Sequence, residues 1–530
     1  MNMKPSCYFF VIIIVCLLTH ACKAGVVQNV EEETPYFGQY LDSIDSTRLK
    51  EGFRKVLDAS GKGGLSDKTV TKHYSAALPV DDLPLWFSHN GVDDDAFEML
   101  AFLRREVPMA GLDTNVFLIP QIAEDLQLVQ TLAFDSLRQD INDVLPRLDY
   151  NLSSAYMRFV TSFRYGFMRP DVVFNRLEYK PNTENKVFAR LYDHSVEQPD
   201  YDYALSKMAS SDRIKYLRES VPTDSEYCAL RRAMQTAPDS LRKMLAINME
   251  RLRWRIIPKT DSLGQLISPD ADTLGRRVIV NIPSQQLWAI CPDSVLPMRI
   301  CCGSRKNKTP MLSSMVSYMQ VNPEWIVPQN IVKSDFLSHA GDSAYFAKND
   351  YFITQRSTGD TLVAANVSAR EMESGVVRIA QKRGAGNSLG RVIFRFASNY
   401  GIYLHDTNNR RAFNYVHRTL SHGCIRIEKP YEMACFMLRG ASERTIDRMR
   451  ISMDMEPLTD WGKKWVEDNI DVPRPIMLMN YQYINPHVPL RIVYFTAFPN
   501  PETGVVEYWD DVYGFDEVML QEMKELLDSK

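Results

Sequence analysis

The sequence of 530 residues lacks several features that would each indicate a class of protein. It contains no apolar run of about 18 residues, the length of a membrane-spanning helix, which excludes a polytopic membrane protein. Its 62 Lys and Arg residues do not exceed its 66 Asp and Glu residues, so it lacks the positive field that attracts nucleic acids. It also has no internal repeat. The length and the average composition predict a mostly water-soluble protein of two or three domains.

Cysteine pairs with metal-ligand spacing are absent as well. None of the nine cysteines forms a CxxC pair, and no Cys/His cluster has the spacing of a zinc site, so we predict no metal site. Outside the N-terminal 24 residues the cysteines are Cys228, Cys291, Cys301, Cys302, Cys424 and Cys435. Disulfides are permitted in an exported protein, but their pairing cannot be read from the sequence.

The N-terminus has the pattern of a secretory signal, which we assign to residues 1–24. Lys4 precedes an apolar core of 11 residues, 8–18, which is too short to span a bilayer and predicts export. Two interpretations of the cleavage site stay open. Cys22 could be the acylated residue of a lipoprotein, or an ordinary signal peptidase could cleave after Ala24.

Residues 25–270 are predicted to form a mainly helical domain. Apolar residues recur at helical spacing in 95–105, in 151–165 and in 241–254, and Ser153 or Asn151 could cap the second of these helices. The loop 261–275 is rich in Ser, Asp, Pro and Gly, which indicates a domain boundary.

After this boundary the pattern changes to short strands separated by Pro and Gly. The predicted strands are 277–282, 287–290, 298–302, 392–396, 402–404 and 491–497, with a helical stretch at about 430–468. Residues 330–390 interrupt them with a mixed, polar segment that reads as a surface insertion covering a site. The fold class is therefore α+β, with a helical domain followed by a mostly β domain.

One cysteine has neighbours that could activate it. A cysteine attacks carbonyls as a thiolate, so it needs a base or a cation nearby. His405 ends a predicted strand, and the chain between it and Cys424 is long enough to loop back and bring the two together. Gly423 would let backbone N–H groups face a developing oxyanion. By spacing alone, however, a buried and inert cysteine is the commoner outcome.

The surrounding motifs favour catalysis. Residues 404–407 read LHDT and residues 421–426 read SHGCIR, which together resemble the signature of YkuD-type L,D-transpeptidases. The resemblance extends over roughly residues 145–515 and includes the helical scaffold of the large YcbB-like subgroup. It implies a catalytic domain at 276–515, a mobile cap at 330–390 and a C-terminal tail at 516–530. One departure is that too few residues separate the scaffold from the helix at 241–254 to hold a peptidoglycan-binding module.

The resemblance also implies roles for the neighbours of the cysteine. His405 would be the general base, oriented by a backbone carbonyl or by the Asp406 side chain. His422 could shape the oxyanion site or only hydrogen-bond the loop, and Arg426 could clamp a substrate carboxylate or be a structural cation. The oxyanion or substrate-binding group further includes Ser421 and Gly423. Tyr403 should share a face with His405 and could line the site, but a tyrosine of the hydrophobic core is an equally good interpretation. Trp288 and Trp325 stay unassigned.

The implied activity is formation of 3→3 crosslinks between peptidoglycan stem peptides in the periplasm, through a thioester on Cys424. We expect no cofactor and no nucleic-acid partner, and we expect contact with a membrane only through a lipid anchor on Cys22. Two alternatives remain. Water rather than an amine could resolve the thioester, giving an L,D-carboxypeptidase or a crosslink hydrolase, or the protein could be a non-catalytic peptidoglycan-binding scaffold.

Overall fold

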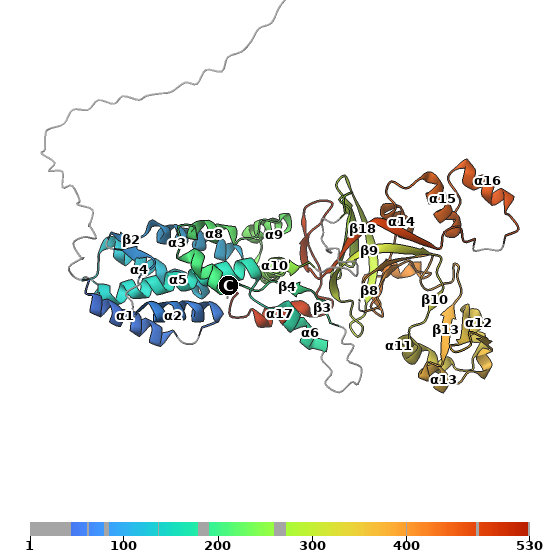
Figure 1. The fold of residues 1–530 in the computed structure, drawn as a ribbon, viewed down its shortest axis with the longest axis horizontal. Coiled ribbons are helices and arrows are strands. Elements are labelled where there is room, and N and C mark those ends of the chain that lie inside the picture. Colours follow the sequence, from blue (N-terminus) through green and yellow to red (C-terminus); the bar gives the residue numbers. More distant parts are fainter. Residues whose placement is uncertain are drawn as a thin grey trace, which may run out of the picture.

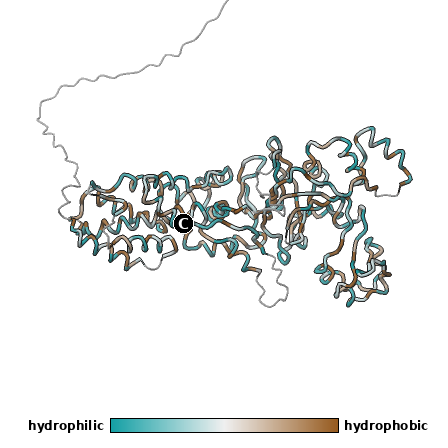
Figure 2. Tube along the Cα trace, in the orientation of Figure 1, coloured by the Kyte–Doolittle hydropathy of each residue, from teal (hydrophilic) through white to brown (hydrophobic). Residues whose placement is uncertain are grey.

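The computed structural model describes residues 44–60, 63–78, 84–88, 90–135, 137–178, 190–258, 272–398, 400–472 and 476–527. The predicted signal at 1–24, with Cys22, lies outside these residues. Among the described helices, none is both long and apolar enough to cross a membrane. Along the chain, hydrophobic and hydrophilic stretches alternate, as expected of elements that bury one face (Figure 2).

The N-terminal half is a bundle of helices, which confirms the predicted helical domain (Figure 1). Its helices are α1 (Ser46–Ala59), α2 (Leu65–Ala77), α3 (Asp94–Met109), α4 (Ile119–Thr131), α5 (Ile141–Tyr165), α6 (Pro170–Asn175), α7 (Tyr201–Met208), α8 (Arg213–Glu219), α9 (Ser225–Thr236) and α10 (Asp239–Arg253). The central helix α5 packs against α1, α2, α4 and α7. We predicted its cap at Ser153 or Asn151, which is wrong. The helix begins ten residues earlier, where the Asp140 side chain accepts a hydrogen bond from the N–H of Asn142 at 2.9 Å.

The second half is built on a sheet that closes into a barrel, which confirms the mostly β domain. Its strands are β6 (Arg277–Asn281), β7 (Gln286–Cys291), β8 (Ser294–Gly303), β9 (Met311–Val321), β14 (Val392–Phe396), β15 (Leu404–His405), β17 (Ile425–Ile427) and β18 (Tyr481–Val493). Their order is β14-β15-β17-β8-β7-β6-β18-β9, and a further pairing of β14 with β9 closes the ring. The short strand β16 (Thr419–Ser421) adds to β8. Closure leaves no free edge along this ring and fills its interior with apolar side chains.

A separate lobe follows β9, and we call residues 325–381 the cap lobe (Figure 1). It contains β10 (Trp325–Ile326), α11 (Gln329–Ile331), α12 (Ser343–Lys348), β11 (Tyr351–Gln355), β12 (Thr361–Leu362), α13 (Ala369–Ser374) and β13 (Val377–Gln381). We predicted a polar surface segment, but the lobe has a hydrophobic core of its own. That core is built from Val327, Val332, Phe336, Phe346, Ile353, Val367, Met372, Val377 and Ile379. Scattered single apolar residues, rather than long runs, supply this core.

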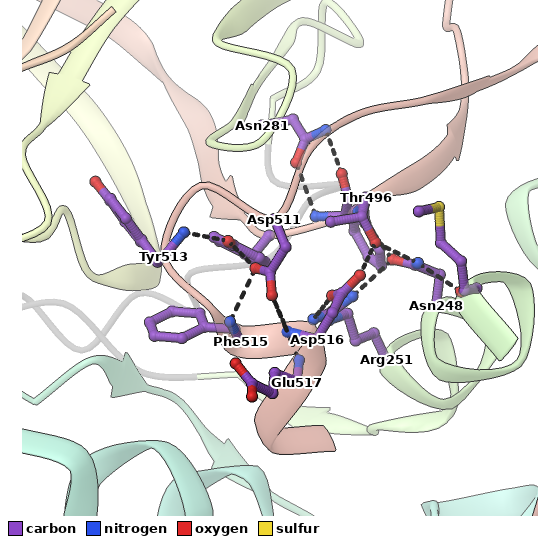
Figure 3. Close-up of polar contacts among 12 residues, drawn as sticks. Asn248, Arg251, Asn281, Thr496, Asp511, Tyr513, Phe515, Asp516 and Glu517 are labelled. Carbon is purple, nitrogen blue, oxygen red and sulfur yellow. Dashed lines mark hydrogen bonds and ion pairs between the residues drawn. The ribbon is translucent and has the colours of Figure 1, made fainter. Parts of the chain in front are cut away.

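Three helices and a C-terminal segment complete the second half. The helices are α14 (Pro430–Met437), α15 (Glu443–Ser452) and α16 (Asp460–Asp468). Residues from 516 on, which we predicted as a tail, include most of helix α17 (Phe515–Glu522), which packs on the scaffold helix α10. The carboxylate of Asp511 accepts hydrogen bonds from the main chain at the start of α17, from Phe515 at 2.8 Å and from Asp516 at 2.9 Å (Figure 3). The segment 515–527 is thus part of the folded core.

A buried polar network joins the two halves at this point. Arg251 of α10 donates to Asp516 at 2.6 Å and to Asn248 at 2.8 Å (Figure 3). Asn248 in turn exchanges two hydrogen bonds with Thr496, which precedes β19 (Ala497–Pro499). Because breaking one member of such a network would leave buried polar groups unpaired, the scaffold and the barrel are held in one fixed arrangement here.

Candidate active site

Two adjacent parallel strands bring the predicted catalytic residues onto one face of the barrel. His405 of β15 lies opposite Arg426 of β17 in the strand register. One residue pair back, the N–H of Ile425 donates to the carbonyl of Tyr403, which places Tyr403 opposite Cys424. Because side chains two apart point to the same face, Cys424 and His405 are diagonal neighbours on that face.

The His405 ring is held in one tautomer by the main chain. Its Nδ1 lies 2.5 Å from the carbonyl oxygen of Asp406, so Nδ1 carries the proton and donates it there. This leaves the Nε2 lone pair available to accept a proton. Burial, and after it the charge of Arg426, lowers the pKa of His405 to about 3. The ring is therefore neutral at physiological pH and competent as a base.

The Asp406 side chain has another task. Its carboxylate accepts hydrogen bonds from the N–H of Arg391 at 2.8 Å and from the guanidinium of Arg410 at 3.1 Å. Of the two orienting groups that the sequence left open, the backbone carbonyl is therefore the one that contacts His405. The carboxylate instead fixes the peptide unit that carries this carbonyl.

Cys424 is a neutral thiol in the resting protein. Burial raises its pKa, while the main chain and hydroxyl of Tyr403 and the charges of Arg395 and Arg426 oppose the rise. Within the described residues, no hydrogen bond links the thiol to the His405 ring. Hydrogen bonds between a catalytic group and its base often form only when substrate is bound. The thiol proton would then pass to His405 during the attack on a carbonyl and not before it.

The loop before Cys424 is closed by a serine. The Ser421 hydroxyl donates to the carbonyl of Cys424 at 2.5 Å and accepts the N–H of Gly423 at 3.1 Å. Gly423 has a φ of 114°, a conformation that side-chain-bearing residues rarely adopt. We predicted that backbone N–H groups near Gly423 and Cys424 face the oxyanion, and of these the N–H of Gly423 donates to Ser421. The N–H of Cys424, which has no partner in the part of the chain that the structure describes, is the donor left for that task.

Two residues from distant segments, Thr309 and Tyr513, support this loop through a chain of hydrogen bonds. The Thr309 hydroxyl donates to the carbonyl of Gly423 at 2.8 Å and accepts the N–H of Gly303 at 2.9 Å. The Tyr513 hydroxyl donates to the carbonyl of Gly303 at 2.6 Å and accepts the N–H of Thr309 at 3.2 Å. Since Tyr513 lies two residues before the start of α17, the C-terminal segment contributes to the geometry of the nucleophile.

Two contacts connect the cap lobe to the site. The exposed His422 side chain lies 3.6 Å from the carboxylate of Asp335, at Nε2 and Oδ2. Trp325 of β10 packs on the cores of both the barrel and the cap lobe, and it lies beside the Tyr403 hydroxyl. His422 therefore lies at the boundary with the cap lobe, where its side chain is exposed.

Sequence reasoning missed several residues of this site. Tyr403 was left open although its spacing from His405 was informative, and its ring centroid lies 5.7 Å from that of His405. Thr309 and Arg395 carried no local signal because they come from distant segments, and Trp325 was left unassigned. The buried Nε of Arg426 has no hydrogen-bond partner among the described residues, which is consistent with a carboxylate-binding role. The six described cysteines are all unpaired, and no cluster of metal-ligating side chains exists among the described residues.

Comparison with known proteins identifies the family. A family model described as the L,D-transpeptidase catalytic domain, YkuD, matches residues 275–446, and a Scaffold domain model matches residues 69–234. A protein of Haemophilus influenzae (strain ATCC 51907 / DSM 11121 / KW20 / Rd), named "Putative L,D-transpeptidase", is 24% identical over 368 residues. That match covers 66% of each chain, just under two thirds of the relative. The chain thus carries a Scaffold domain followed by a YkuD L,D-transpeptidase catalytic domain. The family acts on peptidoglycan peptides through a cysteine.

The pH dependence of acylation should report on Arg426. Its positive charge disfavours the imidazolium form of His405, so Arg426→Gln is expected to raise the pKa of His405 above about 3. A base of higher pKa is protonated sooner as the pH falls, so the acid limb of the rate should move to higher pH. The rate of acylation by a carbapenem, followed by intact-protein mass spectrometry across the acid range, measures this limb.

The matched control is Arg444→Gln, at an exposed guanidinium that stacks on Trp461 away from the site. Its acid limb should coincide with that of the wild type. An acid limb that stays in place in Arg426→Gln would contradict the assigned electrostatic role.

Proposed function

We propose that the protein is an exported L,D-transpeptidase that forms 3→3 crosslinks between peptidoglycan stem peptides. The observation that carries the proposal is the position of Cys424 beside a buried, neutral and oriented His405 in a YkuD domain. A neutral imidazole with a free Nε2 is the form that removes a thiol proton.

The first half-reaction makes a thioester. Sγ of Cys424 attacks the carbonyl on the L-centre of the third stem residue while His405 takes the thiol proton. The N–H of Cys424 stabilises the oxyanion, a contribution of about 3 kcal/mol for one well-placed donor. When the intermediate collapses, the C–N bond to the terminal D-alanine breaks and His405 protonates the leaving amine.

The second half-reaction transfers the acyl group. A side-chain amine of a second stem attacks the thioester carbonyl and loses its proton to His405. The C–S bond then breaks, the thiol is restored, and an amide joins the two stems. The unpartnered Nε of Arg426 suits a stem carboxylate near the reacting carbonyl. The contact of His422 with Asp335 of the cap lobe, and that of Trp325 of the cap lobe with Tyr403, favour an amine over water as acceptor, because a lobe closed over the thioester excludes solvent.

Residues 1–24 support export of this enzyme, since an apolar core of 11 residues follows Lys4. We propose a periplasmic location, either free after cleavage behind Ala24 or anchored through a lipid on Cys22. Labelling cells with an alkyne-bearing fatty acid separates the two forms, because only the lipoprotein incorporates the label and Cys22→Ala abolishes it.

Product analysis tests the proposed reaction. Purified protein is incubated with disaccharide-tetrapeptide, and the products are read by mass spectrometry. A crosslinked dimer that disappears in Cys424→Ala is the expected result. Free tripeptide without dimer would replace the transpeptidase by an L,D-carboxypeptidase, and unchanged substrate would favour a non-catalytic scaffold.

A further inference from the structure

A row of side chains crosses the outer face of the barrel from the nucleophile to open solvent. It starts at Cys424 with Tyr403 opposite, and Arg395 of β14 comes next, its guanidinium carbon 4.4 Å from the centroid of the Tyr403 ring. Tyr318 of β9 lies opposite Arg395, and Tyr483 of β18 lies opposite Tyr318. Paired residues of neighbouring strands point to the same face, so these five side chains form one continuous line.

The far end of the row is an exposed aromatic cluster. Tyr318, Tyr481 and Tyr483, which we call the tyrosine cluster, have ring centroids 6.3 Å apart for Tyr318–Tyr481 and 6.1 Å apart for Tyr318–Tyr483. Exposure rises along the row, from 9% at Tyr403 to 75% at Tyr483, and Tyr481 is 56% exposed. Gathered aromatic rings that stay in water mark a binding surface, because each ring offers a flat apolar face and a polar hydroxyl.

Between the nucleophile and the tyrosine cluster lies an uncompensated cation. Among the described residues, the Arg395 side chain has no hydrogen bond or ion pair with any carboxylate, and its guanidinium lies over the Tyr403 ring. A guanidinium in this position presents its donors to a carboxylate on the ligand.

The spacing of the row matches the chemistry of a donor stem. Neighbouring strands are about 4.8 Å apart, so Arg395 lies about 10 Å and the tyrosine cluster about 14–19 Å from Cys424 along the row. An extended peptide rises about 3.5 Å per residue. The second stem residue is joined through its side-chain carboxyl, so its free carboxylate is seven bonds from the carbonyl carbon of the third residue, and the sugar is fourteen bonds from it. At about 1.2 Å per bond in an extended chain these separations are about 8 Å and about 17 Å. The free carboxylate therefore falls near Arg395, and the amino sugar falls near the tyrosine cluster.

We infer that the tyrosine cluster is a subsite for the amino sugar that carries the donor stem, with Arg395 binding the stem carboxylate between sugar and nucleophile. This inference rests on the proposed function. It also accounts for glycan binding in a chain with no room for a separate peptidoglycan-binding module between its helices at 225–236 and 239–253.

Binding to the full-length Cys424→Ala protein tests the subsite, because this protein cannot turn the ligand over. Calorimetry gives the affinity for disaccharide-tetrapeptide and for the same tetrapeptide without sugar. We expect the sugar-bearing ligand to bind more tightly, and we expect Tyr481→Ala/Tyr483→Ala to reduce that preference about tenfold. Arg395→Gln should weaken both ligands, since both carry the carboxylate.

The matched control is Tyr203→Ala, at an exposed tyrosine of the scaffold helix α7, and it should keep the preference. Tyr483→Ala alone replaces the double variant if the latter does not fold. Equal affinities for the two ligands, or a preference that survives in the variants, would overturn the subsite. Turnover of disaccharide-tetrapeptide by the wild type is scored separately and tests the proposed function itself.

Discussion

Replacing Cys424 by serine is expected to abolish turnover, with a loss of about 10⁴-fold or more, while the protein stays folded. Serine has nearly the same shape, but its hydroxyl is far less acidic than a thiol, and a neutral His405 is too weak a base to activate it fully. The thiol is half-buried and packs against the barrel core, so this conservative change should leave the melting temperature close to that of the wild type.

Covalent labelling gives the same prediction a second measurement. A carbapenem presents a strained lactam carbonyl, and intact-protein mass spectrometry should show one adduct on the wild type. The adduct should be lost in Cys424→Ser and in Cys424→Ala. Cys435→Ser is the matched control, because Cys435 is another half-buried thiol whose pKa is raised by burial. Full turnover in Cys424→Ser, or an adduct that persists in it, would remove Cys424 from its assigned role.

Removing the cap lobe is expected to change the products from crosslinked dimer to free tripeptide. Without the lobe, water reaches the thioester and competes with the acceptor amine, whereas acylation of Cys424 should stay measurable. The structure gives clean cutting points. Ile326 and Ala380 lie opposite each other in an antiparallel pair, so a two-residue Asn-Gly turn can replace residues 327–379.

The core of the barrel should survive this replacement. The lobe has a separate hydrophobic core, and Trp325, which packs on both cores, is kept. Asp335→Asn serves as a graded control, because it keeps the lobe and removes only the charge that faces His422. Its products should shift less than those of the shortened protein. An unchanged ratio of dimer to tripeptide in a folded, shortened protein would mean that the lobe does not exclude water.

Local sequence patterns were sufficient for the framework of this protein. Helical periodicity in 95–105 and β-branched runs such as 392–396 depend on neighbouring residues alone, and the structure has helix α3 and strand β14 there. The paired motifs at 404–407 and 421–426 likewise identified the family, because their residues are close in sequence. The start of α5 was misplaced, since a cap depends on which of several polar side chains reaches a free N–H.

The sequence by itself determined the order of the two domains, the family, and the pairing of Cys424 with His405 as a hypothesis. Only the tertiary structure decided that a main-chain carbonyl sets the His405 tautomer, and that Ser421 occupies the N–H of Gly423. Only the tertiary structure showed that Cys424, Arg395 and the tyrosine cluster lie in one row across neighbouring strands. The physical reason is register: which residues oppose one another across strands far apart in the chain is fixed by hydrogen bonds of the closed barrel, and no local pattern encodes them.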